Sequence, residues 1–410
     1  MKILIITQYY LPEVGAPQNR LHSLSKNLQK LGHDVNILTA MPNYPEMKIH
    51  DSYKGKFWYT EEIDGISILR SWLFISKSDS KISRLLCYLS FSFTASVVGL
   101  FKGKRKYDLI ISESPSLFII IPALFLKIVK RATLNFNVSD VWPEIGIVFG
   151  HLKGKATIKF FYALERFCYY CSNTITGQTQ GIVDSISTRF PSKKIHLLPN
   201  GYDFKELDEK TIEPFNLREK LELTADNVIF AYGGLLGHGY EVELMIKAAK
   251  AFEGSNASFV IIGDGTRRKE LEQISHELNC RNVFFLGKVT LDIMQSILSE
   301  IDVLVIPVFK TTMDGIIPSK IFDALASGKP LLLGVDGEAK RKFIEKGKCG
   351  LFFNPGNLEE LTSSINILLK DESLRKTLGQ NGYSLGRKYF DRAEIAKDFM
   401  KFIEFVETPS

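Results

Sequence analysis

The stretch Val228–Gly265, VIFAYGGLLGHGYEVELMIKAAKAFEGSNASFVIIGDG, decides the fold class of this chain. It opens with an apolar run at Val228–Tyr232, passes a glycine pair, and continues into a helical pattern near residues 241–253. A second apolar run, Ser258–Ile262, then ends in Gly263-Asp-Gly265. Short strands rich in β-branched residues that alternate with helices predict a parallel sheet covered on both faces.

The same alternation extends over the whole chain. The first strand is expected at Lys2–Thr7, and Pro17 then opens a helix in which leucines recur at helical spacing. Further strands are expected at residues 35–39, 108–112, 133–137, 173–176, 195–198, 283–286, 302–307, 331–333 and 351–353. The pattern therefore predicts an α/β protein with two Rossmann-like, doubly wound domains that face each other across a cleft.

Domain boundaries follow from composition. A polar stretch with few core candidates follows Pro199-Asn200-Gly201. We therefore expect a first domain at residues 1–200, a second at 201–388, and a terminal helix at 389–410. One face of that helix carries Ile395, Phe399, Phe402, Ile403 and Val406, so it is expected to cross back and pack on the first domain.

Charge is distributed unequally along the 410 residues. Residues 1–200 carry 25 Lys and Arg against 14 Asp and Glu, whereas residues 201–410 carry 27 against 32. A basic half indicates either nucleic acid or an anionic membrane surface as partner. The hydrophobic content of 45% and charged content of 24% are those of a globular protein.

The run Leu85–Phe101 favours the membrane and argues against nucleic acid. It has no charged residue, and Lys and Arg flank it on both sides. It is short for a spanning helix, so we expect a helix that lies on an anionic bilayer with its basic flanks among the head groups. The alternative is a buried helix with solvated flanking charges. Because Thr7 and Gln8 interrupt the apolar start, no cleavable signal is expected. A cytoplasmic protein, peripheral on the inner membrane face, is the expectation.

Metal and disulfide chemistry are not indicated. The five cysteines form no regular framework, and Cys168 and Cys171 have no second pair at zinc-ligand spacing. The seven histidines are scattered. We expect reduced, buried thiols, no metal and no cofactor.

The segment Asp314–Pro330 predicts a site for a nucleoside diphosphate. Pro318 suits a first helical turn, so the backbone amides near Ile316, Ile317 and Ser319 are expected to face an anion, with Lys320 adding positive charge. A carboxylate at Asp323 can accept hydrogen bonds from two ribose hydroxyls. The alternative is an ordinary amphipathic helix.

Glycines after strands extend this candidate donor site. Gly15 and the pair Gly233-Gly234 let the backbone approach a phosphate without a Cβ, although each alone is also typical of a plain turn. The candidate donor-binding residues are Gly15, Gly233, Gly234, Gly265, Gly287, Asp314, Ile316, Ile317, Ser319, Lys320 and Asp323.

The segment Asp140-Val-Trp-Pro-Glu144 provides candidate acceptor-binding residues. Asp140 and Glu144 are expected to bind hydroxyls, and Trp142 to stack on a sugar ring. The alternative is a loop capped by Asp140 and packed by Trp142.

Several motifs, spread in order over nearly the whole chain, resemble glycosyltransferase family 4, in the branch that builds bacterial O-antigen and capsule sugars and that includes L-fucosamine-transferase-like proteins. They are Pro12-Glu-Val-Gly15-Ala, Gly32-His-Asp-Val, Met41-Pro-Asn-Tyr-Pro45, Asp140-Val-Trp-Pro-Glu144, Leu164-Glu-Arg166, Pro199-Asn-Gly201, Gly263-Asp-Gly265 and Pro318-Ser-Lys320 with Asp323.

This resemblance implies a GT-B fold and a metal-independent transfer with retention of configuration. The second domain then binds the donor, expected to be a UDP-sugar with an N-acetylated hexosamine or a deoxy relative. The first domain binds a polyprenyl-diphosphate-linked glycan. Lys320 is the candidate for stabilising the departing diphosphate, and Asp140 the second catalytic candidate.

The chain departs from the family pattern at three places. Of the family's paired glutamates, the second is matched by Asp323, whereas Gly315 aligns with the first and Asp314 is one residue out of register. The usual Arg and Lys are absent from Gly233–Gly239, and Ser139 replaces a histidine before Asp140. The departures at the basic and acidic positions keep open a non-catalytic scaffold of polysaccharide assembly. A sugar-nucleotide epimerase of the same fold is a separate alternative. A Rossmann oxidoreductase is disfavoured because Gln8–Ala16 lacks G-x-G-x-x-G.

Overall fold

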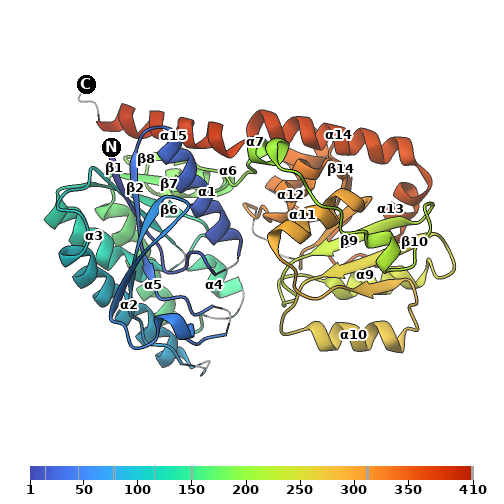
Figure 1. Cartoon of the computed structure of the whole chain (residues 1–410), viewed down its shortest axis with the longest axis horizontal. Coiled ribbons are helices and arrows are strands. Elements are labelled where there is room, and N and C mark those ends of the chain that lie inside the picture. Colours follow the sequence, from blue (N-terminus) through green and yellow to red (C-terminus); the bar gives the residue numbers. More distant parts are fainter. Residues whose placement is uncertain are drawn as a thin grey trace. The chain divides into compact units, whose positions relative to one another are not determined.

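The computed structural model describes residues 1–407 except 14, 45, 77, 79, 115, 149, 151 and 311–313. The chain forms two compact units (Figure 1). Unit 1 comprises Met1–Asn200 with Arg392–Ser410, and unit 2 comprises Gly201–Asp391. The chain thus leaves unit 1, completes unit 2, and returns to unit 1 at Arg392.

Unit 1 contains an eight-stranded sheet in the order β3-β4-β2-β1-β5-β6-β7-β8. Every neighbouring pair is parallel except β3 and β4, which form an antiparallel hairpin. Its strands are β1 (Lys2–Ile6), β2 (Asp34–Ala40), β3 (Trp58–Ile63), β4 (Ile66–Ser71), β5 (Leu109–Glu113), β6 (Thr133–Val138), β7 (Thr174–Gly177) and β8 (Lys194–Leu197).

The hairpin β3-β4 is absent from the sequence prediction. Strand β3 is an edge strand whose residues are only half-buried or exposed, so it carries no continuous apolar run. Asp64 and Gly65 turn the chain between the two strands with positive φ angles of 50° and 76°. Such a turn permits a close hairpin, and the Asp64-Gly65 pair was the sequence signal from which the hairpin could have been predicted.

Helices cover both faces of the unit 1 sheet. They are α1 (Ala16–Lys30), α2 (Lys81–Phe101), α3 (Ile120–Lys130), α4 (Glu144–Val148), α5 (Lys155–Cys171), α6 (Gln180–Arg189) and α15 (Arg392–Glu407), with short 3-10 turns η1 (Asp51–Tyr53) and η2 (Leu117–Ile119). Alternate residues of β1 point to opposite faces. Ile3 and Ile5 share a core with α1 and α15, whereas Leu4 and Ile6 share one with α2, α3 and α5.

Unit 2 contains a six-stranded, fully parallel sheet in the order β11-β10-β9-β12-β13-β14. Its strands are β9 (Val228–Gly233), β10 (Ala257–Ile262), β11 (Val283–Phe285), β12 (Val303–Pro307), β13 (Leu331–Gly334) and β14 (Gly350–Phe352). Its helices are α7 (Phe204–Glu209), α8 (Leu217–Lys220), α9 (Val242–Lys250), α10 (Arg268–Glu277), α11 (Leu291–Glu300), α12 (Lys320–Ser327), the π-helix η3 (Lys340–Lys346), α13 (Leu358–Lys370) and α14 (Glu372–Tyr389).

Two cores sandwich this second sheet. Phe230 and Tyr232 of β9 pack with α9, α10 and α13, whereas Ile229 and Ala231 pack with α11 and α12. In both units the first strand is central, and the chain winds first to one side and then to the other. The reversal lies between β1 and β5 in unit 1 and between β9 and β12 in unit 2. Open α/β sheets bind ligands beyond the carboxyl ends of the strands at such a reversal.

Helix α12 is held close to α14 by glycines. A Cβ on Gly379 would lie 2.0 Å from the carbonyl oxygen of Gly328, just after α12. Cβ atoms on Gly382 and Gly386 would lie 3.1 Å from atoms of the Leu325 side chain. Because a larger residue at Gly379 would meet backbone, this packing fixes the position of α12 and of the residues at its start.

Candidate functional site

Three glycine turns meet at the carboxyl edge of the unit 2 sheet. The Gly234 N–H donates to the Ile262 carbonyl at 2.8 Å, and the Gly263 N–H donates to the Gly287 carbonyl at 2.9 Å. A Cβ on Gly263 would lie 1.9 Å from Gly234 O, and one on Gly265 would lie 2.3 Å from Leu236 O. The turns therefore pack backbone against backbone. The Gly234 amide is therefore not free to donate to a phosphate, because it already has an acceptor within the sheet edge.

Lys320 is the first residue of α12, and its side chain lies against Gly234. A Cβ on Gly234 would be 2.6 Å from Lys320 Cε and 2.7 Å from Nζ. Nζ lies 3.9 Å from the centroid of the Tyr240 ring and 5.3 Å from that of Tyr232. Among the residues that the structure describes, Lys320 has no hydrogen-bonding or ion-pair partner, so its charge is available to a ligand.

Backbone donors accompany this lysine. The N–H groups of Ile316, Ile317, Ser319 and Lys320 make no hydrogen bond within the described part of the chain, whereas Ile321 N–H already donates to the Pro318 carbonyl. The helix begins at Lys320, not at Pro318 as the sequence pattern suggested. The free amides therefore belong to the segment that leads from β12 into α12, at the reversal of strand order. Free amides beside a lysine form a suitable anion site.

The two candidate carboxylates differ in their surroundings. Asp323 lies in the first turn of α12, half-buried, one turn from Lys320 on the same helix face. Asp314 is exposed and accepts a hydrogen bond from Arg341 of η3 at 2.7 Å. That ion pair engages Asp314 at the surface, so the structure gives it a partner other than a ligand.

In unit 1 a buried polar cluster lies beside the reversal between β1 and β5. The Arg20 Nη2 of α1 lies 2.5 Å from Glu113 Oε1 at the end of β5, and both side chains are almost fully buried. Asn137 Nδ2 donates to Glu113 Oε2 at 2.6 Å, and the Ser139 hydroxyl donates to Glu113 Oε1. The Gln178 amide reaches Ser139 Oγ at 2.6 Å. Sequence reasoning missed Arg20 and Glu113, although a glutamate directly after an apolar strand was an available signal.

Asp140 follows this cluster directly. Its side chain is exposed, yet the surrounding protein withdraws the carboxyl from bulk water and raises its pKa to about 6. The negative charge of Glu113 raises the pKa further, and Arg20 opposes that shift. Asp140 is therefore an accessible carboxyl that changes charge near neutral pH.

Trp142 and Glu144 are engaged in packing and an ion pair. Trp142 is partly buried against the core, with its ring centroid 5.9 Å from that of Phe161. Glu144 Oε1 lies 3.9 Å from Arg189 Nη1, and the same guanidinium holds the buried Glu165 bidentately at 2.7 and 2.8 Å. For Trp142, the packed-loop alternative describes the structure better than ring stacking on a sugar.

Glu13 joins two further motifs of unit 1. Its buried carboxylate accepts the backbone N–H groups of Asn43 and Tyr44, each at 2.8 Å, and that of Tyr10 at 3.1 Å. The loops that follow β1 and β2 are thus tied together. Gly15 precedes α1 as its cap residue, and a Cβ there would lie 2.6 Å from Gln18 Oε1. Val14 and Pro45 of these motifs lie outside the described residues.

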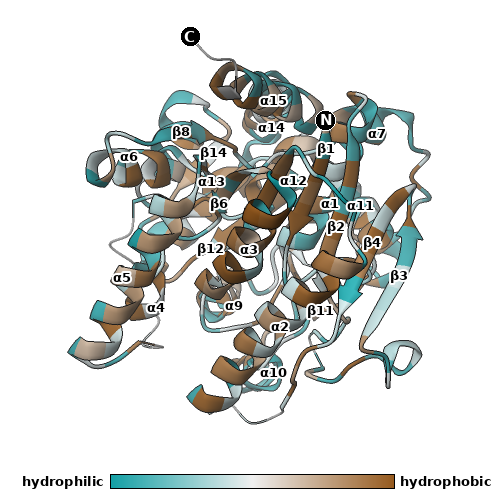
Figure 2. Ribbon diagram, turned by 90° about the vertical axis from the view of Figure 1, so that its left-hand side faces the viewer, coloured by the Kyte–Doolittle hydropathy of each residue, from teal (hydrophilic) through white to brown (hydrophobic). Residues whose placement is uncertain are grey.

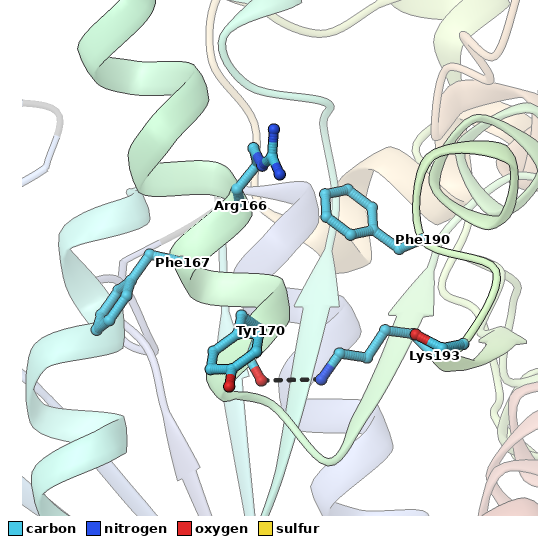
Figure 3. A pocket seen from close by; sticks show the side chains of 6 residues that line it. Arg166, Phe167, Tyr170, Phe190 and Lys193 are labelled. Carbon is cyan, nitrogen blue, oxygen red and sulfur yellow. Dashed lines mark hydrogen bonds between the residues drawn. The ribbon is translucent and has the colours of Figure 1, made fainter.

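An open depression on unit 1 contains none of these candidates (Figure 3). It has a volume of about 460 Å³ and is lined by Arg166, Phe167, Tyr170, Phe190, Ser192 and Lys193. The Lys193 ammonium donates to the carbonyls of Tyr170 and Ser172, at the end of α5. The Lys193 charge therefore compensates a helix terminus.

Within the described residues, no group of three or more His, Cys, Asp or Glu side chains has the arrangement of a metal site. The five cysteines are free thiols.

Comparison with known proteins identifies the class. Residues 15–201 match the family model "Glycosyl transferase 4-like domain", and residues 214–385 match "Glycosyl transferases group 1". Together these matches span most of both units, and the chain belongs to this family of glycosyltransferases. Similar solved structures have the GT-B fold. The structure of Anabaena HepE in complex with UDP-glucose covers 99% of this chain and all of its own, with a TM-score of 0.70 at 17% identity.

Two curated relatives act in, or are assigned to, glycan synthesis. The putative colanic acid biosynthesis glycosyl transferase WcaI of Escherichia coli is 24% identical over 80% of this chain and 82% of its own length. A Campylobacter jejuni protein, N-acetylgalactosamine-N,N'-diacetylbacillosaminyl-diphospho-undecaprenol 4-alpha-N-acetylgalactosaminyltransferase, is 23% identical over 55% of this chain and 58% of its own.

Proposed function

We propose that this glycosyltransferase moves a sugar from a UDP-sugar to a polyprenyl-diphosphate-linked glycan in O-antigen or capsule synthesis. The transfer retains anomeric configuration and uses no metal or cofactor, and the sugar is an N-acetylated hexosamine or a deoxy relative. A related enzyme whose name includes a diphospho-undecaprenol acceptor supports the choice of acceptor. A solved structure of similar fold in complex with UDP-glucose supports the choice of a UDP-sugar donor.

The observation that carries the proposal is the position of Lys320 beside unpaired backbone amides at the reversal between β9 and β12. Cleavage of the sugar–phosphate bond leaves negative charge on the diphosphate. A cation and oriented N–H groups stabilise that charge more in the transition state than in the ground state, which lowers the barrier. Asp323, one turn along α12, is suited to bind the ribose hydroxyls.

In unit 1, Asp140 is the group best suited to bind an acceptor hydroxyl. It is exposed, and its pKa of about 6 leaves it ionised at neutral pH, where a carboxylate accepts hydrogen bonds. In a front-face transfer the departing phosphate can itself take the proton of the acceptor. A carboxylate then serves to orient the acceptor and to stabilise the positive charge that develops on the sugar.

An exposed apolar surface on α2, α3 and α5 supports attachment to a membrane. Figure 2 shows α2 and α3 as strongly hydrophobic ribbons. Ile82, Phe93 and Phe101 of α2 are 71%, 67% and 75% exposed, and Ile128 of α3 is 68% exposed. The opposite face of α2 is buried in the core, so the buried-helix alternative describes that face. Among the described helices α2 alone has the length and composition to cross a membrane, which by itself is weak evidence for a span.

The helices of this surface are directly connected and bear basic residues. Lys127 of α3 donates to the Cys171 carbonyl at the end of α5 at 2.7 Å. The basic residues at or just beyond the helix ends are Lys81, Arg84, Lys102, Lys104, Arg105, Lys106 and Arg131. Apolar side chains with a basic rim fit an anionic bilayer, with the protein peripheral on the cytoplasmic face.

The decisive experiment is a thermal-shift screen with UDP- and GDP-sugars, followed by an assay of donor hydrolysis. A donor that binds the folded state raises the melting temperature by mass action. We expect stabilisation by a UDP-sugar and slow release of free sugar with the anomeric configuration of the donor retained. Interconversion of the sugar nucleotide would indicate an epimerase. The absence of both donor binding and turnover would contradict the proposal.

A further inference from the structure

The buried cluster around Glu113 is part of a larger polar network inside unit 1. Thr176 Oγ1 donates to Asn137 Oδ1 at 2.7 Å and lies 3.0 Å from Asn135 Oδ1. Asn135 Nδ2 in turn donates to Thr174 Oγ1 at 3.0 Å. The network thus runs along β6 and β7 from the interior to the carboxyl edge of the sheet. Such a network costs stability unless every member is paired, so its presence in a core calls for a role.

The edge of this network holds the segment that carries Asp140. Ser139 is bound on three sides, by Glu113 through its hydroxyl, by the Gln178 amide, and by Ser114 Oγ, which accepts its N–H at 3.2 Å. Arg20 Nη2 approaches the same hydroxyl at 3.4 Å. Residue 139 is therefore fixed, and Asp140 follows it directly in the chain.

The charges next to Asp140 come from the same two residues. The charged groups that act on its carboxyl are Glu113 at the end of β5 and Arg20 from α1, with opposite signs. They form a buried pair of zero net charge, so their effects on Asp140 partly cancel. Removing either one leaves the other uncompensated in a medium that screens charge poorly.

We propose that Arg20 and Glu113 are positioning residues, which hold Ser139 and Asp140 at the sheet edge and set the charge around the Asp140 carboxylate. They do so without touching the substrate, because both side chains are buried. This inference rests on the proposed acceptor role of Asp140, and it explains why a charged pair is kept inside unit 1.

A titration of the Asp140 carboxyl by NMR, in full-length protein labelled with carboxyl-¹³C aspartate, tests the charge balance. Asp140→Asn assigns the signal. We expect Glu113→Gln to lower the pKa of Asp140, Arg20→Gln to raise it, and Arg20→Lys to leave it near its original value. Thr174→Val removes a hydrogen bond at the far end of the same network and serves as the matched control, with no shift expected.

Shifts of the same sign in Glu113→Gln and Arg20→Gln, or an equal shift in Thr174→Val, would overturn the inference. Ser139→Ala keeps both charges and tests positioning even where a charge variant fails to fold. We expect it to raise the KM for the acceptor about tenfold with donor binding unchanged, and an unaltered KM would also overturn the inference. If the pKa shifts occur while Asp140→Asn transfers sugar normally, the positioning effect stands and the acceptor role of Asp140 fails.

Discussion

The Lys320 ammonium occupies the space that a side chain at Gly234 would need, because a Cβ there would lie 2.7 Å from Nζ. Gly234 also has a φ angle of 138°, which residues other than glycine rarely adopt. The position of Lys320 at the start of α12 therefore depends on the glycine after β9. A substitution at Gly234 tests this dependence.

Gly234→Ala should lower the free energy of unfolding by about 1–3 kcal/mol, because the backbone would be strained. It should also reduce turnover, since the new methyl group displaces Lys320. Gly237→Ala is the matched control, because the nearest atom to a Cβ at that position is Leu235 Cδ2, at a distance of 3.6 Å. Chemical denaturation measures the difference, and equal stability of the two variants would contradict the strain.

Lys320→Ala should lower kcat about 100-fold or more while donor affinity falls far less. Loss of one preorganised donor to a developing anion has effects of about this size. Calorimetry with UDP and steady-state rates separate the two effects. Lys247→Ala, on the exposed surface of α9, is the control. A loss of donor affinity with kcat unchanged would show that Lys320 binds the donor without assisting the chemistry.

We expect Asp140 to make sugar transfer dependent on pH. Its pKa of about 6 predicts that acceptor use falls as the pH drops through about 6 and the carboxylate is protonated. The folded state favours the protonated form, so the stabilising contribution is present at low pH and is lost as the pH rises through about 6. Asp140→Asn should therefore be more stable than the natural protein above pH 6 and similar to it below about pH 4. Melting curves across this pH range test the predicted difference in stability. A pH–rate profile tests the predicted fall in transfer, which should be absent from Asp140→Asn.

The pair of Phe93→Glu and Ile82→Glu should reduce binding to anionic vesicles at least about tenfold, because each removes an exposed apolar side chain that would otherwise leave water. Co-sedimentation with phosphatidylglycerol vesicles measures the change. Ile367→Glu, at a 47% exposed position of α13 in unit 2, is the control and should leave binding unchanged. Unaltered binding of the double variant would exclude α2 from the membrane contact.

Arg189→Ala should lower the free energy of unfolding by about 3–5 kcal/mol. Its bidentate partner Glu165 is fully buried, and removal of the guanidinium leaves an unpaired charge inside unit 1. Lys376→Ala breaks an exposed pair with Glu372 and should change stability by less than about 1 kcal/mol. Denaturant unfolding of both variants provides the test, and similar losses would be inconsistent with a buried ion pair.

Sequence periodicity predicted the fold to the extent that the strands carry apolar runs. The strands β1, β2, β5, β9, β10 and β12 are mostly buried and rich in apolar residues, and they were located within a residue or two. The edge strand β3 alternates between exposed and half-buried residues, so its weak pattern was missed together with β4. The predicted start of α12 at Pro318 is two residues early, because composition alone does not distinguish a proline in the first helical turn from one that precedes the helix.

The candidate site was predictable where the ligand groups follow one another in sequence, and not where they meet through tertiary contacts. Lys320 and Asp323 lie on one helix turn, so spacing was sufficient. Arg20 and Glu113 are 93 positions apart and meet only because α1 packs beside the end of β5. The ion pair between Asp314 and Arg341 was unpredictable for the same reason, because the sequence around Asp314 does not indicate which residue will lie beside it.

The return of the chain to unit 1 has a consequence for biosynthesis. Ala396, Phe399, Met400 and Ile403 of α15 complete the core that also contains Ile3 and Leu21. A ribosome must therefore translate all of unit 2 before the earliest-made unit can bury this surface. We infer that unit 2 can mature first, and that a nascent chain stalled before Arg392 carries an open apolar patch at its oldest end.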